Sequence, residues 1–500
     1  MEPIVSLTPA SGPDPLAALA APPPGSAMVE LRMDLLPDLD PAVAVASCPL
    51  PIVATLRSES DGGLGPDDPE ARAAWLRRAV EAGCALIDLE ADRDLPLIRV
   101  LGLEPERVVL SSHDPIGTPD DLDSRCDALL AQPVRWVKII PTTTCIADLV
   151  RVLALHERQR RRPPGRRRLI TFGMGAVGLP SRFLAPLLGP PVMFVAWNDT
   201  AAAAPGQITA AHLQSVVGHL TGPPRRLFGV VGANVAGSLS PALHAAGYRE
   251  LGLPDALLPF SVPDPGELGL LFAAAGETAL DAIGLPAAGW AVTSPYKRRA
   301  AEAADVVAPR ANRARAANTL VLRPGRILAE NTDADGVVGS LTALGVDPAK
   351  RGAVVQGTGG AARGAAVGLD LAGAAVALRG RDPERTNSVA DMIGVAVLTP
   401  DEIAPPGSIL VNATPLGSRP DDPCPFSPDE IAAAAAVVEM VYGDGPTLLE
   451  QTAAERAVPA VSGREMLAYQ AFAQIAAFTG HLPPRRAMLA ALGLDLPPTG

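Results

Sequence analysis

Lysine is almost absent from this chain, and the few lysines that remain are candidates for amine chemistry. The sequence holds Lys138, Lys297 and Lys350, and all its other basic residues are arginine. A guanidinium stays protonated in proteins, whereas a lysine can lose its proton and act as a nucleophile or proton carrier. The alternative is that three lysines survive by chance in an arginine-rich composition.

The first lysine lies in a setting suited to Schiff-base chemistry. Lys138 sits in the apolar run Val134–Ile140, whose side chains are expected to favour the neutral amine. A neutral amine attacks a ketone to form an imine, and a nearby histidine can move the protons. His113 ends the preceding expected strand, and a carboxylate with several hydroxyls could be held by Arg32, Arg57, Arg182 and Gln207. In the alternative interpretation, His113 is a structural hydrogen bonder and the arginines are surface charges.

The second lysine follows a turn stiffened by proline. Lys297 ends the segment Thr293-Ser-Pro-Tyr-Lys, and Asp333 ends Asn331-Thr-Asp. Reduction of a carbonyl by hydride needs a proton donor, which a lysine–aspartate pair provides. Ser238 and Ser240 lie upstream and, taken alone, are equally typical of turn or helix capping.

A glycine-rich turn indicates a dinucleotide. The segment Gly357-Thr358-Gly359-Gly360-Ala361 follows an expected strand and precedes an expected helix, so its backbone can approach a pyrophosphate. The next strand ends with Arg379 and Arg381 and carries no acidic residue at its tip. Arginines there suit a 2′-phosphate, which predicts NADP as cofactor in preference to NAD. The alternative is that these arginines cover a helix end.

These residues require an α/β scaffold. Seven short apolar runs between residues 28 and 197 alternate with helical stretches, which predicts βα units and a (β/α)₈ barrel over residues 28–220. A linker at 221–226 leads to an expected α/β substrate domain at 227–335. An expected Rossmann-like NADP domain follows at 336–465, and helices at 466–500 are expected to return to the substrate domain.

Composition limits the partners and the compartment. The net charge of −12 argues against nucleic acid, and the five cysteines show neither metal-ligand spacing nor a disulfide framework. Residues 1–27 lack a signal peptide or membrane span and are expected to form a flexible tail. We therefore expect a cytoplasmic enzyme of small molecules without a metal, as a monomer or weak homo-oligomer.

The N-terminal motifs resemble the type I 3-dehydroquinate dehydratases over about residues 28–220. The resemblance implies that Lys138 forms an imine with the C3 ketone of 3-dehydroquinate and that His113 acts as general acid and base. Asp61 stands where the family usually has glutamate, close to the catalytic histidine. The segments that carry the resemblance contain Glu30, Arg32, Arg57, His113, Lys138, Arg182 and Gln207.

The C-terminal motifs resemble shikimate dehydrogenase over about residues 227–490. The resemblance implies that Lys297 and Asp333 transfer a proton while NADPH reduces 3-dehydroshikimate. It assigns substrate binding to Ser238, Ser240, Thr293, Asn318, Tyr442 and Gln470, and adds Thr414 and Gly463 to the cofactor site. Three alternatives stay open: an active dehydrogenase beside an inactive dehydratase, a quinate dehydrogenase, and a non-catalytic ligand sensor.

Overall fold

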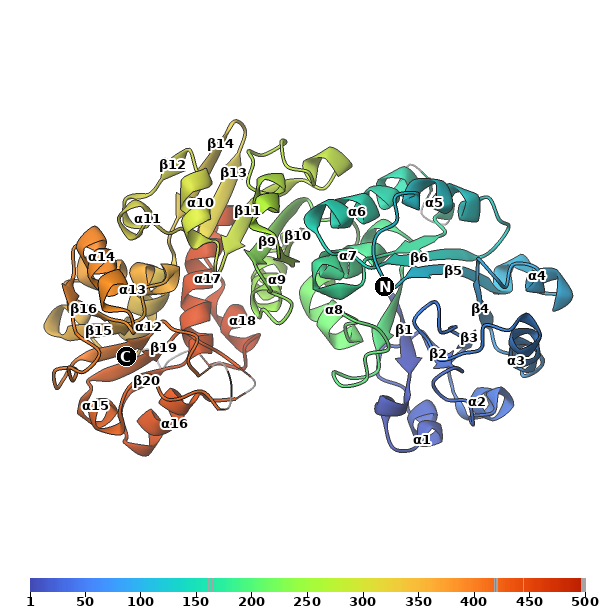
Figure 1. Cartoon of the computed structure of the whole chain (residues 1–500), viewed down its shortest axis with the longest axis horizontal. Helices are drawn as coiled ribbons and strands as arrows, with labels where there is room; N and C mark the ends of the chain where they lie inside the picture. Colours follow the sequence, from blue (N-terminus) through green and yellow to red (C-terminus); the bar gives the residue numbers. More distant parts are fainter. Residues whose placement is uncertain (161, 164–165, 418, 420, 444, 496–500) are drawn as a thin grey trace.

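A computed structural model describes residues 1–495 apart from 161, 164–165, 418, 420 and 444. The chain forms three sheets in two lobes, with the barrel at the right of Figure 1 and the other two sheets at the left. Within the described residues no helix is long and apolar enough to span a membrane. The same residues contain no cluster of three or more histidine, cysteine or acidic side chains that could hold a metal.

The first sheet is a nearly closed barrel of eight parallel strands in the order β7-β6-β5-β4-β3-β2-β1-β8. Its strands are β1 (Glu2–Leu7), β2 (Met28–Arg32), β3 (Ile52–Thr55), β4 (Leu86–Glu90), β5 (Val108–Asp114), β6 (Trp136–Pro141), β7 (Leu169–Thr171) and β8 (Val192–Ala196). The helices are α1 (Pro15–Ala20), α2 (Pro41–Ser47), α3 (Pro69–Glu81), α4 (Leu97–Val100), α5 (Leu122–Leu130), α6 (Ile146–Arg160), α7 (Gly175–Leu188) and α8 (Ala210–Val217). The predicted barrel is therefore confirmed.

The prediction of a flexible N-terminal tail is wrong. Residues 2–7 form β1, which pairs with β2 on one side and β8 on the other, and α1 follows at Pro15–Ala20. Ile4, Val5 and Leu7 are almost fully buried. The prolines and alanines that follow masked this short apolar strand, and its burial comes entirely from strands distant in sequence.

Aspartate followed by proline marks the start of several helices. Asp40 and Asp68 accept a hydrogen bond from the backbone at the N-termini of α2 and α3, and Asp382 does so at α14 (Pro383–Ile393). Proline at the first helical position needs no hydrogen bond, while the aspartate satisfies a free backbone amide. This local pattern explains why each helix begins where it does.

The second sheet is mixed, in the order β10-β9-β11-β13-β14-β12. Its strands are β9 (Arg226–Gly232), β10 (Asp255–Ser261), β11 (Ala287–Val292), β12 (Val306–Val307), β13 (Thr319–Arg323) and β14 (Arg326–Glu330). The helices of this region are α9 (Ser240–Glu250), α10 (Lys297–Ala303) and α11 (Pro309–Ala314). The antiparallel β13–β14 hairpin turns the chain back and leads to α12 (Asp333–Ala343), which begins with Asp333.

The third sheet is parallel, in the order β17-β16-β15-β18-β19-β20, as in a Rossmann-like fold. It comprises β15 (Gly352–Gln356), β16 (Ala375–Arg379), β17 (Ala396–Val397), β18 (Ile409–Asn412), β19 (Ala436–Glu439) and β20 (Ala460–Val461). Its helices are α13 (Gly360–Leu371), α14, α15 (Pro428–Ala433) and α16 (Leu448–Glu455). The helices α17 (Gly463–Thr479) and α18 (Arg485–Ala490) follow and pack against α9 of the second sheet.

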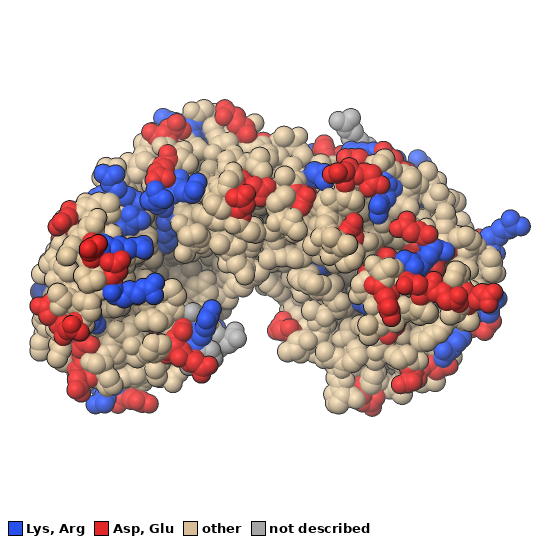
Figure 2. All heavy atoms as spheres, viewed as in Figure 1, with Lys and Arg blue, Asp and Glu red and all other residues tan. Residues whose placement is uncertain are grey.

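The barrel packs directly against the second sheet. Helix α7 contacts β10, and α8 contacts α9. The carboxylate of Glu267 accepts hydrogen bonds from the backbone amides of Ile146 and Ala147 at the start of α6, at 2.9 and 3.1 Å. One continuous hydrophobic core extends from the barrel into the second sheet. Figure 2 shows a deep notch between the two lobes, with acidic and basic side chains both scattered over this face.

Candidate active sites

One cavity of about 340 Å³ at the carboxyl ends of the barrel strands brings the predicted dehydratase residues together. The lining residues predicted from the sequence are Glu30, Arg32, Arg57, Asp61, His113, Lys138, Arg182 and Gln207. The parallel strands of a barrel all end at the same face, so residues from distant parts of the chain meet there.

Lys138, on β6, faces acidic groups and one aromatic ring. Its Nζ lies 3.2 Å from Asp88 Oδ2, 4.0 Å from Glu30 Oε1, and 4.0 Å from the centre of the Phe194 ring. The prediction of apolar neighbours around the Lys138 amine is therefore wrong on this side of the strand. Successive side chains of a strand point to opposite faces, so Val137 and Ile139 lie away from the amine.

His113, at the end of β5, has a buried imidazole close to a carboxylate. Its Nδ1 has no hydrogen-bond partner among the residues that the structure describes and lies 3.7 Å from Asp61 Oδ2. Burial and the nearby positive charges, that of Arg57 first, hold the pKa of His113 well below its usual value. Burial and the neighbouring Glu90 carboxylate raise the pKa of Asp61 to about 6. A neutral imidazole is ready to accept a proton, and an ionised Asp61 would stabilise the imidazolium that results.

Arg182 is a buried cation without an ion pair among the described residues. Its Nη2 donates to the Pro205 carbonyl at 3.0 Å, and its guanidinium lies over the Phe172 ring. Its Nε has no hydrogen-bond partner in the described part of the chain. Burial lowers the pKa of Arg182 to about 9, so it remains charged at neutral pH. An unpaired cation lining a cavity fits an anionic substrate group.

Two other predicted residues, Arg32 and Arg57, form ion pairs with acidic side chains of the protein. Arg32 forms a two-pronged pair with Asp34 at 2.9 and 2.6 Å. Arg57 contacts Asp88 at 3.0 Å and Glu90 at 3.2 Å. These buried pairs fix the rim of the cavity and leave Arg182 as the freer cation.

The sequence interpretation missed Ser6. Its hydroxyl donates to Glu30 Oε2 at 2.5 Å and accepts from Gln207 Nε2 at 3.0 Å. Ser6 lies on β1, the segment predicted to be a tail, so no local signal placed it in a site. In a strand, Ser6 lies on the same face as Ile4, but this spacing alone does not identify a site residue.

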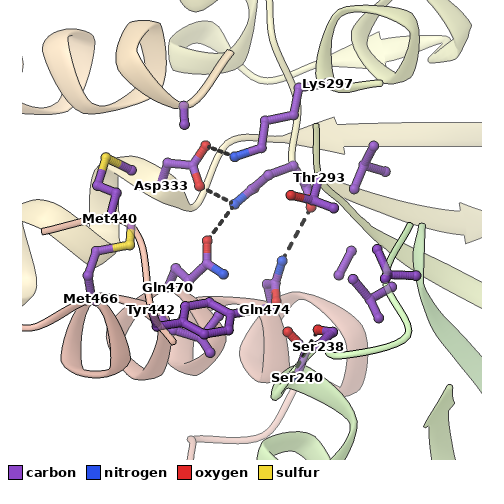
Figure 3. A pocket seen from close by; sticks show the side chains of 18 of the residues that line it. Ser238, Ser240, Thr293, Lys297, Asp333, Met440, Tyr442, Met466, Gln470 and Gln474 are labelled. Carbon is purple, nitrogen blue, oxygen red and sulfur yellow. Dashed lines mark hydrogen bonds and ion pairs between the residues drawn. The ribbon is translucent and has the colours of Figure 1, made fainter. Parts of the chain in front are cut away.

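A second cavity, of about 410 Å³, lies between the second and third sheets. Figure 3 shows Lys297 and Asp333 pointing toward one another, with Lys297 Nζ 2.5 Å from Asp333 Oδ2. Asn318 Nδ2 donates to Asp333 Oδ1 at 3.0 Å and to Gln470 Oε1 at 3.1 Å. Further predicted residues that line this cavity are Ser238, Ser240, Thr293, Ala361, Tyr442 and Gly463.

Gln474 also lines this cavity and was not predicted. Its Nε2 donates to the Asn318 carbonyl and to Thr319 Oγ1, and its Oε1 lies 3.3 Å from His244 Nε2. Gln470 and Gln474 are four residues apart on α17 and therefore lie on the same face of the helix. That spacing is the signal by which the sequence could have identified it.

The glycine-rich turn is shaped for close contact. Gly357 has φ +124°, and a Cβ there would lie 2.9 Å from the Ala413 carbonyl oxygen, beside Thr414. A Cβ on Gly360 would lie 2.9 Å from Lys297 Cβ, so the start of α13 packs on Lys297. A Cβ on Gly463 would overlap the Val441 carbonyl. Thr358 and Gly359 complete a turn into the N-terminus of α13, which fits the phosphates of a dinucleotide.

The two arginines at the tip of β16 differ in their availability. Both line a cavity of about 540 Å³. Arg379 Nη1 lies 2.6 Å from Glu430 Oε1, and its Nε donates to Gln356 at 2.7 Å. Burial disfavours the Glu430 carboxylate, but Arg379 and other donors lower its pKa to about 2. Arg381 is exposed and has no ion pair among the described residues, so it is the freer cation for a phosphate.

We expect Arg381→Gln to raise the KM for NADPH by roughly tenfold, because one charge-assisted contact to a phosphate is lost. The KM for NADH, which has no 2′-phosphate, should stay unchanged. Initial rates with each cofactor measure this, and Arg456→Gln on the same sheet's exposed surface is the matched control. An equal rise with both cofactors would place Arg381 away from the 2′-phosphate.

Family models match both halves of the chain. Residues 5–222 match a family model described as type I 3-dehydroquinase. Residues 230–320 match the shikimate dehydrogenase substrate binding domain, and 463–492 the shikimate 5′-dehydrogenase C-terminal domain.

Some relatives align with nearly all of this chain, and others align with about half of it. The chloroplastic bifunctional 3-dehydroquinate dehydratase/shikimate dehydrogenase of Arabidopsis thaliana is 30% identical over 92% of this chain and 79% of its own length. A shikimate dehydrogenase (NADP(+)) of Acidiphilium cryptum is 40% identical over 52% of this chain and 92% of its own length. A solved structure of dehydroquinate dehydratase and shikimate dehydrogenase from S. pombe AroM aligns over 98% of each chain, with 23% identity and a TM-score of 0.44. Its 30% identity to the Arabidopsis thaliana protein over 92% of the chain shows that the chain belongs to the bifunctional 3-dehydroquinate dehydratase/shikimate dehydrogenase family.

Proposed function

We propose that the barrel dehydrates 3-dehydroquinate through an imine on Lys138, and that the second cavity reduces the product to shikimate with NADPH. The observation that carries the proposal is that each cavity combines one lysine amine with groups able to move a proton. His113 lies with Lys138 in the first cavity, and Asp333 contacts Lys297 in the second.

In the barrel, Lys138 passes a proton to the neutral His113 and its free amine attacks the C3 ketone. His113 then returns the proton to the departing oxygen, and loss of water forms the protonated imine. The imine withdraws electrons, so the C2 proton can pass to His113. The protonated His113 then returns this proton to the leaving C1 hydroxyl, and water releases 3-dehydroshikimate from Lys138. Arg182 binds the carboxylate of the substrate, and Gln207 also helps to hold the substrate.

In the second cavity, the residues bind the substrate and supply a proton. When bound, reduced NADP supplies the hydride for the C3 ketone. Lys297 donates the proton to the developing C3 oxygen, and its contact with Asp333 holds the amine in place. Asn318 and Gln470 orient Asp333 and hydroxyl groups of the substrate, while Ser238 and Ser240 bind its carboxylate.

A coupled assay tests the whole proposal. The protein is incubated with 3-dehydroquinate and NADPH, and the loss of nicotinamide absorbance is followed without any added dehydratase. We expect NADPH consumption equal to shikimate formed. Consumption with 3-dehydroshikimate but not with 3-dehydroquinate would leave only the dehydrogenase. Consumption with neither would support a non-catalytic ligand sensor.

The second candidate substrate for the dehydrogenase is quinate. Ser238 and Ser240 favour shikimate, because the additional hydroxyl of quinate needs room beside the carboxylate. Ser238 Oγ accepts from the Ser240 backbone amide at 3.2 Å, and Ser238, Ser240 and Tyr442 all line this cavity. Oxidation of shikimate and of quinate by NADP in parallel distinguishes the two.

The remaining proposals concern organisation and compartment. We place the functional units at 2–220, at 227–335 together with the helices from 466, and at 336–465; residues 496–500 of the predicted C-terminal helices lie outside the described residues. All five cysteines are free thiols, which supports a reducing, cytoplasmic compartment. A monomer or weak homo-oligomer is our proposal for the state in solution.

A further inference from the structure

The loop that carries Asp61 lies over the mouth of the barrel. It joins β3 to α3 through residues 58–67, and Ser58 forms an isolated bridge with Gly65. Its tip is open to solvent, because the Leu64 side chain is 68% exposed. Backbone hydrogen bonds from Gly63 to Ser58 and from Gly65 to Arg57 close the loop, and contacts from outside it help to keep Asp61 beside His113.

Arg93 supplies several of these outside contacts, beside those of Asp34 to Leu64, Glu90 to Ser58 and Arg72 to Pro66. It lies after β4, three residues beyond Glu90. Its Nη2 donates to Ser60 Oγ at 2.5 Å, and its Nη1 donates to Asp67 Oδ1 at 2.8 Å. The same guanidinium lies 3.7 Å from Asp61 Oδ1, and its Nε lies 2.9 Å from Glu90 Oε2. One side chain thus ties three residues of the loop to the end of a barrel strand.

The charges around Asp61 give Arg93 a second effect. Burial and Glu90 raise the pKa of Asp61 to about 6, whereas Arg57 and Arg93 oppose this rise. Arg57 lies 3.9 Å from Asp61 but also contacts Asp88 and Glu90, which are closer. The remaining neighbours are His113 on β5 and Asp67 at the far side of Arg93. Arg93 is therefore the second of two cations that favour an ionised Asp61.

We propose that Arg93 is a positioning residue of the dehydratase, which holds the loop over the barrel and keeps Asp61 as a carboxylate beside His113. The inference rests on the proposed roles of His113 and Asp61. It also concerns the one position of the Lys–His site where the chain carries aspartate in place of the longer glutamate. Arg93 is not a lining residue of the cavity, so its influence passes through Asp61 and through Glu90, which it also contacts.

The pH dependence of dehydratase kcat/KM tests this role. Activity requires ionised Asp61, so it falls as the pH drops through the pKa of that group, near pH 6 in the unmodified protein. Arg93→Gln removes a cation, which raises the Asp61 pKa and moves the acidic limb to higher pH by roughly one unit. Arg93→Lys keeps the charge and should leave the limb in place, with a lower maximum rate because the fork to Ser60 and Asp67 is lost.

Two matched variants complete the design. Asp67→Asn removes the charge of the 51% exposed partner of Arg93, while Arg57 and Arg93 remain near Asp61. The acidic limb of the pH profile should therefore stay at or slightly below its original pH. Asp61→Asn tests the underlying role of Asp61: if it keeps full activity and an unchanged profile, the proposed function of Asp61 fails, whatever Arg93 does. Reduction of 3-dehydroshikimate by the same preparations reports correct folding of the dehydrogenase half, and thermal unfolding curves report that of the barrel.

An unmoved limb in Arg93→Gln, with Asp61→Asn impaired, would overturn the inference for Arg93 alone. An equal displacement in the Gln and Lys variants would also overturn it, since the charge would not be the cause. If Arg93→Gln has no dehydratase activity but a normal dehydrogenase, the Lys variant decides: a limb at the original pH supports the inference, and a displaced limb contradicts it.

Discussion

Replacing Lys138 by arginine is expected to abolish the dehydration of 3-dehydroquinate and to leave the reduction of 3-dehydroshikimate unchanged. Arginine retains the positive charge that contacts Asp88 and Glu30. It cannot lose its proton, so it cannot form the imine. We expect kcat to fall by at least about 10⁴-fold, the scale seen when a nucleophile is removed from other enzymes.

Borohydride provides the direct test of the covalent step. Treatment in the presence of 3-dehydroquinate should reduce the imine and attach the substrate permanently to Lys138, which mass spectrometry of peptides can locate. The Lys138→Arg protein should gain no mass under the same conditions, and Lys350→Arg, at an exposed site, should label normally. An adduct at another residue, or none in the unmodified protein, would contradict the proposed chemistry.

Replacing Lys297 by methionine is expected to lower the reduction of 3-dehydroshikimate by about 10²- to 10⁴-fold, the usual contribution of a positioned acid. The dehydratase should keep its rate, because the barrel cavity contains no residue of this pair. Methionine fills nearly the same volume but holds no exchangeable proton. Steady-state rates with 3-dehydroshikimate and NADPH measure the effect.

The substitution leaves Asp333 buried and without its cation. Removing one partner of a buried pair costs about 3–5 kcal/mol in other proteins, so unfolding of this half must be separated from loss of the proton donor. The double variant Lys297→Met/Asp333→Asn removes both charges and should recover thermal stability without recovering activity. Recovery of the reduction rate would show that Lys297 is not the donor.

The chemistry-bearing residues were predictable because their types are rare or tightly restricted. Lys138 and Lys297 stand out in a chain that otherwise uses arginine. Gly357 and Gly463 stand where backbone conformation or close contact excludes a larger side chain. Such constraints act on single residues, so they remain visible in sequence.

The features that were missed depend on contacts between distant segments. Strand β1 is short and followed by prolines, and only β2 and β8 make it a strand. The acidic neighbours of Lys138 come from β2 and β4, which no pattern around residue 138 reveals. Arg379 looked like a free cation at a strand tip, but Glu430, about fifty residues later, neutralises it.

The pairing of β1 with β8 also bears on how the protein is made. Glu2 aligns with Val192, so the barrel has an open edge until roughly two hundred residues have left the ribosome. At about 5–20 residues per second, this edge waits on the order of ten to forty seconds for its partner. An unpaired strand edge attracts other chains, which makes this interval the one most exposed to aggregation. The dehydratase can then close before the dehydrogenase has been synthesised, so the two halves mature in the order in which they handle the substrate.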